Sequence, residues 1–80
     1  MIWVYVIQSK LDNGYYIGIT KDIQNRLKKH NKGGVSITKK RKPFSLVYTE
    51  EFENYKKARL REIELKSYKG GNKLKVLLKD

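Results

Sequence analysis

The sequence predicts an α+β domain with the element order β-β-α-β-α-α. Two runs of β-forming residues flank a polar turn, and a third run starts at Phe44. Two segments with helical spacing of apolar residues follow the second and third runs, and a short apolar segment ends the chain. A length of 80 residues fits one small domain, so we expect residues 1–80 to hold no linker, internal repeat or second domain.

The first two predicted strands are joined as a hairpin. Residues 1–8 are apolar at nearly every position, which is typical of a central strand covered on both faces. Residues 10–14 have turn chemistry, because Asn13-Gly14 suits positive φ. Residues 15–20 form the returning strand. Gly18 is unfavourable within it, so we expect another group to approach the backbone closely there.

A short helix is predicted next, over residues 23–31, with Asp22 as its cap. Arg26 and His30 are four residues apart and therefore share one stripe of this helix. Gly33-Gly34 ends the helix. Residues 35–43 are polar and basic, and we expect a loosely held loop that becomes ordered on binding.

The third strand is predicted over residues 44–52, where Phe44, Leu46 and Tyr48 alternate with more polar or smaller residues. A second helix begins near Glu53 or Asn54 and runs to about Tyr68. A short terminal helix over residues 72–79 is expected to dock three leucines inward, namely Leu74, Leu77 and Leu78.

The second helix places an acid on its predicted buried face. Four residues fall within one arc of the helical wheel: Tyr55, Ala58, Glu62 and Leu65. Leu60 and Ile63 are assigned to a neighbouring arc, so this face is expected to be broad. An inward carboxylate is costly unless a partner or a metal ion satisfies it.

The charge of the chain indicates a polyanionic partner. Nineteen Lys and Arg residues against eight Asp and Glu give a formal charge of +11, and nucleic acid would relieve the resulting repulsion. An anionic membrane is disfavoured, since no separate basic amphipathic segment, lipidation signal or spanning segment is present. The absence of cysteine and the single histidine exclude disulfides, thiolate zinc sites and a multi-histidine cage. A cytoplasmic location is the expectation.

The order of motifs along the chain resembles the GIY-YIG nuclease family. The matching positions are Val4-Tyr5-Val6, Tyr16-Ile17-Gly18, Thr20-Lys21-Asp22, Arg26, His30-Asn31, Pro43, Ala58, Arg61-Glu62 and Lys66. The chain is most similar to the small stand-alone bacterial members. These are related to the catalytic subunit of structure-selective endonucleases and to the nuclease domain of the excision-repair incision protein.

This resemblance implies a three-stranded antiparallel sheet flanked by helices and metal-dependent hydrolysis of DNA phosphodiester bonds. It gives Glu62 the role of holding one divalent ion, Mg²⁺ or Mn²⁺. It makes Tyr5 the group that activates water and Tyr16 the group that orients water or phosphate. It assigns Arg26 to the phosphate, and it makes His30 an acceptor or relay for the Tyr5 proton.

Further positions are expected to support the site or to bind DNA. Gly18, Asn31 and Thr38 match supporting positions of the small-member pattern. The basic residues expected at phosphates are Lys21, Lys39, Lys40, Arg41 and Lys66. The chain also departs from the family pattern, with Val4 in place of a glycine and Ile19 where several branches place a lysine.

Each assigned role has a structural rival. His30 is also compatible with a solvated position and Arg26 with an ordinary surface cation. Glu62 lies three residues from Arg59 and four from Lys66, so it also fits an intrahelical ion pair. At the level of function, the alternatives to an endonuclease are a non-catalytic nucleic-acid binding module and a nuclease subunit that requires a targeting protein partner. The oligomeric state leaves no signal in the sequence.

Overall fold

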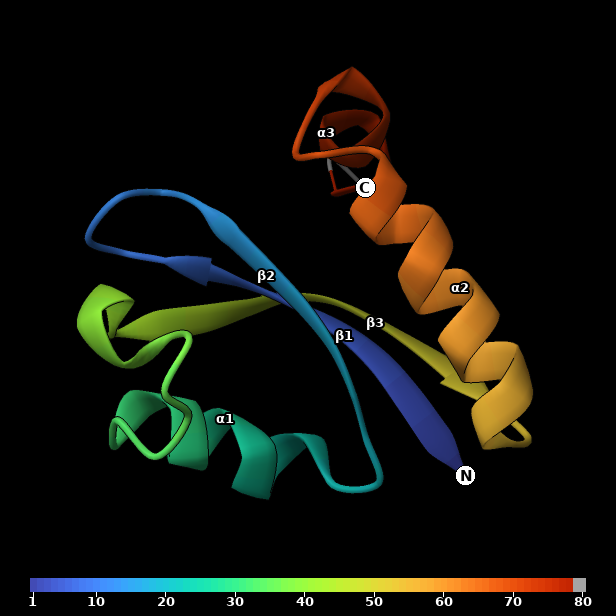
Figure 1. Ribbon diagram of the computed structural model, residues 1–80, viewed down its shortest axis with the longest axis horizontal. Helices are drawn as coiled ribbons and strands as arrows, with labels where there is room; N and C mark the ends of the chain where they lie inside the picture. The colour runs from blue at the N-terminus through green and yellow to red at the C-terminus, as the bar shows by residue number, and fades with distance from the viewer. Residues whose placement is uncertain (79–80) are drawn as a thin grey trace.

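A three-stranded antiparallel sheet forms the centre of the computed structural model, which describes residues 1–78 (Figure 1). The strands are β1 (Ile2–Ser9), β2 (Tyr15–Thr20) and β3 (Phe44–Phe52), in the spatial order β2-β1-β3. The helices are α1 (Ile23–Asn31), the 3-10 turn η1 (Lys39–Arg41), α2 (Tyr55–Ser67) and α3 (Asn72–Leu78). The predicted fold class is confirmed, although Lys79 of the predicted terminal helix lies outside the described residues.

Helices cover both faces of the sheet (Figure 1). Tyr5 and Ile7 of β1 point to the α1 face and pack with Phe44, which is 3% exposed. Val4 and Val6 point to the opposite face, where they pack against α2. Because side chains alternate along a strand, one central strand supplies both cores. None of the helices within residues 1–78 is long and apolar enough to cross a bilayer.

The α1 helix and the loop after it are held by local hydrogen bonds. Asp22 caps α1 by accepting from the Asn25 amide. The expectation of a loosely held loop at residues 35–43 is wrong, because Thr38 is fully buried and the η1 turn follows it. Ser9 Oγ donates to the Arg41 carbonyl oxygen, and Arg41 Nε lies 3.0 Å from Asp12 Oδ2, so the loop is tied to the first hairpin.

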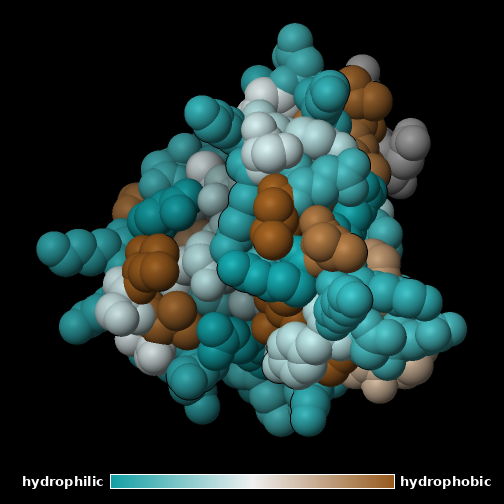
Figure 2. All heavy atoms as spheres, turned by 45° about the vertical axis from the view of Figure 1, so that its right-hand side comes forward, coloured by the Kyte–Doolittle hydropathy of each residue, from teal (hydrophilic) through white to brown (hydrophobic). Residues whose placement is uncertain are grey.

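The buried face of α2 is narrower than the sequence suggested. Ala58, Glu62 and Leu65 are buried, but Leu60 and Ile63 are 62% and 50% exposed. Each residue turns the helix by about 100°, so Leu60 points almost directly away from Ala58. Tyr55, the first residue of the helix, is also exposed. Figure 2 shows that the face carrying α2 is mainly hydrophilic, with small separate apolar patches.

The register of β3 also differs from simple alternation. The pairing register between β1 and β3 shifts between Val6 and Ile7 of β1. As a result, Phe44 points to the α1 face and Tyr48 points to the α2 face. An extra residue in one strand reverses which face the later side chains occupy. Leu46, near this irregularity, is left 39% exposed.

Candidate active site

The Tyr5 hydroxyl is the centre of a polar cluster between β1 and α1. Tyr5 is 2% exposed, and its hydroxyl oxygen lies 2.8 Å from His30 Nε2 and 3.3 Å from Arg26 Nε. Arg26 and His30 are one helical turn apart on α1, so both reach the same phenol. The structure thus brings together three of the predicted site residues, and it places His30 in the interior, where the alternative of a solvated residue does not hold.

His30 is positioned to accept a hydrogen bond from Tyr5. Its Nδ1 lies 2.7 Å from Thr38 Oγ1, and the Thr38 hydroxyl donates to the Val35 carbonyl oxygen at 3.3 Å. The Thr38 oxygen is then free to accept from Nδ1–H, which leaves Nε2 to accept from Tyr5. Burial, followed by the charges of Arg26 and Lys29, lowers the pKa of His30 to about 4. The imidazole is therefore neutral near pH 7.

The phenol of Tyr5 is protonated at neutral pH. Burial is the main cause that raises its pKa, and the hydrogen bond from Arg26 acts in the opposite direction. The charges of Tyr16 and Glu62 also raise this pKa, so both groups are near enough to affect the phenol electrostatically. The permanent charge of Arg26 favours the phenolate once the proton has left.

Tyr16 on β2 lies on the same side of the sheet as Tyr5. Its ring centroid is 6.3 Å from that of Tyr5 and 4.9 Å from that of His30. Tyr16 is half-buried, whereas Tyr5 is buried, so the outer phenol is the one exposed to a ligand. Two phenols at different depths can divide proton transfer and substrate contact between them.

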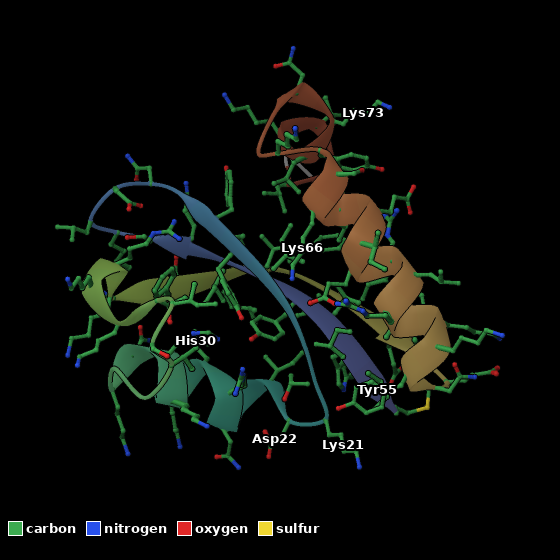
Figure 3. The ribbon with its side chains drawn as sticks, viewed as in Figure 1. Lys21, Asp22, His30, Tyr55, Lys66 and Lys73 are labelled. Carbon is green, nitrogen blue, oxygen red and sulfur yellow. The ribbon has the colours of Figure 1, made fainter. Side chains whose placement is uncertain are left out.

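Glu62 approaches from the α2 layer. Its side chain is 8% exposed; Oε1 accepts from Arg59, and Oε2 lies 3.1 Å from Lys66 Nζ. The intrahelical ion pairs expected as the structural rival are therefore present. Figure 3 shows Lys66 projecting from α2 toward β2. Within residues 1–78, Glu62 influences Tyr5 through its charge, and its hydrogen-bond partners are on α2.

Comparison with known proteins identifies the family of this fold and cluster. The model of the GIY-YIG catalytic domain matches residues 1–75. The chain belongs to the GIY-YIG family. This family is a nuclease family whose members generally use divalent metal ions.

The relatives found are small proteins of similar length. A UPF0213 protein of Staphylococcus saprophyticus is 41% identical over 76 residues, covering 94% of this chain and 92% of the relative. A UPF0213 protein of Staphylococcus aureus is 40% identical over the same length and with the same coverage. The solution structure of a UPF0213 protein from Bacillus halodurans shares 36% identity, covers 92% of each chain and has a TM-score of 0.50.

The carboxylate of Glu62 fits the divalent ion that GIY-YIG nucleases use. It is nearly buried and sits on a regular helix, and a carboxylate oxygen suits Mg²⁺ or Mn²⁺, although its two present partners, Arg59 and Lys66, would have to yield to the ion. Residues 1–78 contain no group of three or more His, Cys, Asp or Glu side chains placed to share an ion. An ion at Glu62 would therefore keep water and substrate phosphate as its other ligands, as Mg²⁺ commonly does.

The predicted DNA-binding cations lie at different places. Lys21 follows β2 and extends away from the sheet (Figure 3), so it does not replace the lysine absent at Ile19. Lys39 and Lys40 are exposed on η1. Arg41 is ion-paired with Asp12, and its guanidinium lies 5.7 Å from the centroid of the Phe44 ring.

The supporting residues act through packing and hydrogen bonds. Thr38 contacts His30 as described above, and Gly18 faces Tyr5. Asn31 Oδ1 accepts from the Phe44 amide at 2.6 Å, and Asn31 Nδ2 donates to the Phe44 carbonyl oxygen at 3.2 Å. Asn31 therefore joins the end of α1 to the start of β3 and fixes the helix that carries Arg26 and His30.

Sequence reasoning missed two parts of the site. Phe44 packs beside His30, with ring centroids 6.0 Å apart, and this contact depends on the β3 register. Lys69 and Lys75 line a groove beside Tyr16. Their only signal in the sequence is positive charge, which they share with many surface residues.

Proposed function

We propose that this protein is a metal-dependent DNA endonuclease that hydrolyses phosphodiester bonds in branched, flapped or nicked DNA during repair or recombination. The observation that carries the proposal is the position of the Tyr5 hydroxyl between a neutral imidazole acceptor and a guanidinium. A buried phenol held this way can pass its proton to a base and remain stabilised as an anion. The formal charge of +11 supports a nucleic-acid substrate.

The chain's own residues supply the proton transfers. Because burial raises the pKa of Tyr5 and lowers that of His30, the phenolate exists only transiently: the hydroxyl proton moves to His30 Nε2 as the proton of the attacking water replaces it. Arg26 stabilises the phenolate and the negative charge that grows on the phosphate, while Tyr16 orients the water or the phosphate. A divalent ion held by Glu62 would supply a Lewis acid for the phosphate and for the departing 3′-oxygen.

The test is cleavage of a panel of labelled DNA substrates in Mg²⁺, in Mn²⁺ and in chelator. We expect ion-dependent products that Arg26→Ala and Glu62→Ala abolish. Lys57→Ala is the matched control, because Lys57 forms an exposed ion pair with Glu53 on the same helix as Glu62. A folded protein that yields no product from any substrate in any ion would overturn the proposal.

A second candidate is a nucleic-acid binding module without catalysis. Two observations favour it. Both carboxylate oxygens of Glu62 are already engaged in ion pairs. Lys21 points away from the sheet (Figure 3), so its amine does not replace the lysine that several family branches carry at the position of Ile19. Equal, salt-sensitive DNA binding by the wild type and Glu62→Ala, without products, would support it. Cleavage that appears only with a co-purified protein would indicate a nuclease subunit that needs a targeting partner.

A further inference from the structure

A basic groove runs beside the candidate active site. It has a volume of about 710 Å³ and lies between the β1–β2 hairpin, the end of α2 and α3. Two fully buried leucines, Leu65 and Leu74, are among its lining residues. Its four cationic residues are Arg41, Lys66, Lys69 and Lys75, and within residues 1–78 it has no acidic lining residue. Tyr15 and Tyr16 also line the groove, and cations beside aromatic rings suit a nucleic-acid strand, because the cations bind phosphates and the rings can stack on bases.

The groove and the catalytic cluster share Tyr16. This residue lines the groove, and its ring centroid lies 4.9 Å from that of His30. A strand whose phosphate lies at Arg26 can therefore continue past Tyr16 into the groove. The neighbouring phosphates would then meet the lysines of α2 and α3.

Lys66 belongs to two sites at once. It lines the groove, and its Nζ lies 3.1 Å from Glu62 Oε2. Its side chain is 50% exposed, whereas the Glu62 side chain is 8% exposed, so the lysine is the partner that is free to turn. Arg59 holds the other oxygen of Glu62 but does not line the groove.

A phosphate in the groove competes with Glu62 for Lys66. When Lys66 turns to the phosphate, Glu62 loses one of its two cations, and its carboxylate becomes a better ligand for a divalent ion. We propose that Lys66 couples binding of a nucleic-acid strand in the groove to binding of a divalent ion at Glu62. The inference rests on the ion site of the proposed function. By linkage, the strand and the ion raise each other's affinity by the same factor.

The coupling is measured by binding in a Tyr5→Phe background, where slow cleavage keeps DNA intact. Mn²⁺ affinity without DNA is read from the electron paramagnetic resonance signal of free Mn²⁺. We expect Lys66→Met to raise this affinity on the order of fivefold or more, since a competing cation is removed. Arg59→Met should raise it too, whereas Lys69→Met, which changes only the groove, should leave it unchanged.

Fluorescence anisotropy of a short labelled single-stranded oligonucleotide, with and without Mn²⁺, gives the coupling itself. We expect Mn²⁺ to tighten DNA binding by the parent protein and by Arg59→Met, and to tighten it markedly less in Lys66→Met, where only the contact of the ion with phosphate remains. Equal tightening in Lys66→Met would overturn the inference. The same titration on Glu62→Ala, which lacks the ion-binding carboxylate, measures how much Mn²⁺ changes DNA affinity through charge screening alone. Unchanged Mn²⁺ affinity in Lys66→Met, or no Mn²⁺ effect beyond that in Glu62→Ala, would overturn the inference.

These outcomes separate the inference from the proposed function. Cleavage by the wild type without coupling would refute the role of Lys66 alone. Coupling in a protein that cleaves no substrate would refute the nuclease proposal alone, because both titrations measure binding.

Discussion

Tyr5 occupies the space that a side chain at Gly18 would need. The two residues are partners across the β1–β2 pair, and a Cβ added at position 18 would lie 2.5 Å from the Tyr5 hydroxyl oxygen. The phenol crosses the backbone of β2 at this point on its way to α1. The glycine that weakens the strand is thus what lets the phenol reach His30 and Arg26.

Gly18→Ala should therefore displace the phenol. A contact this short forces a shift of Tyr5 or of β2, and overpacking of a well-packed interior typically costs about 1–3 kcal/mol. We expect a loss of stability in urea titrations and a loss of cleavage. Gly71→Ala is the control: its added Cβ would lie 3.1 Å from the Tyr68 carbonyl oxygen, a much milder contact far from Tyr5, so both losses should be smaller.

Tyr5→Phe should keep the fold and lose most of the activity. The ring still fills the core, but no hydroxyl remains to exchange a proton, and such catalysis contributes roughly 10²–10⁴-fold. Single-turnover cleavage rates measure the effect. Tyr48→Phe removes a phenol hydroxyl that bonds Glu50 on the other face of the sheet, so its cleavage rate should match the wild type. Equal rates for the two variants would contradict the role of Tyr5.

The stability of the protein should depend on His30 between about pH 4 and pH 6.5. The pKa of His30 is lowered from 6.5 to about 4 in the folded protein, so the unfolded chain binds more protons in this interval. Stability is therefore lost as the pH falls through it. Thermal unfolding of the wild type and His30→Gln should show a steeper fall from pH 7 to pH 5 for the wild type. Parallel curves would mean that the imidazole titrates normally.

Asn31→Ala should destabilise the protein without removing a group that touches substrate. It leaves the amide and carbonyl of Phe44 without their side-chain partners, which costs about 1–3 kcal/mol when such groups are buried. Asn25→Ala is the control, because Asn25 Nδ2 bonds Asp22 on the exposed start of the same helix. If both variants unfold at the same urea concentration, Asn31 does not anchor α1 to β3.

Much of the fold follows from local patterns in the sequence. The apolar run of β1, the Asn13-Gly14 turn and the Asp22 cap each act within a few residues, and the elements they predict are present. The inward position of Glu62 also followed from its spacing to Ala58 and Leu65 on one helix. The roles of these residues in catalysis remain predictions.

The features that sequence reasoning missed depend on contacts between distant segments. The strand irregularity that separates Phe44 from Tyr48 arises in the pairing with β1, not in β3 alone. The loop of residues 35–43 is ordered by Ser9 and Asp12, which come from the first hairpin. Leu60 is apolar, but its angle on the helix points it away from the buried Ala58, so it is exposed.

The central claim is that Tyr5, Tyr16, Arg26 and Glu62 surround one phosphate. The most direct test is a crystal structure of Tyr5→Phe with Mn²⁺ and a DNA substrate, in which anomalous scattering locates the ion. We predict an ion bound by Glu62 and a phosphate that contacts both this ion and Arg26, with the ring at position 5 facing them. An ion elsewhere, or DNA held only by Lys39, Lys40 and the exposed basic surface, would contradict the account.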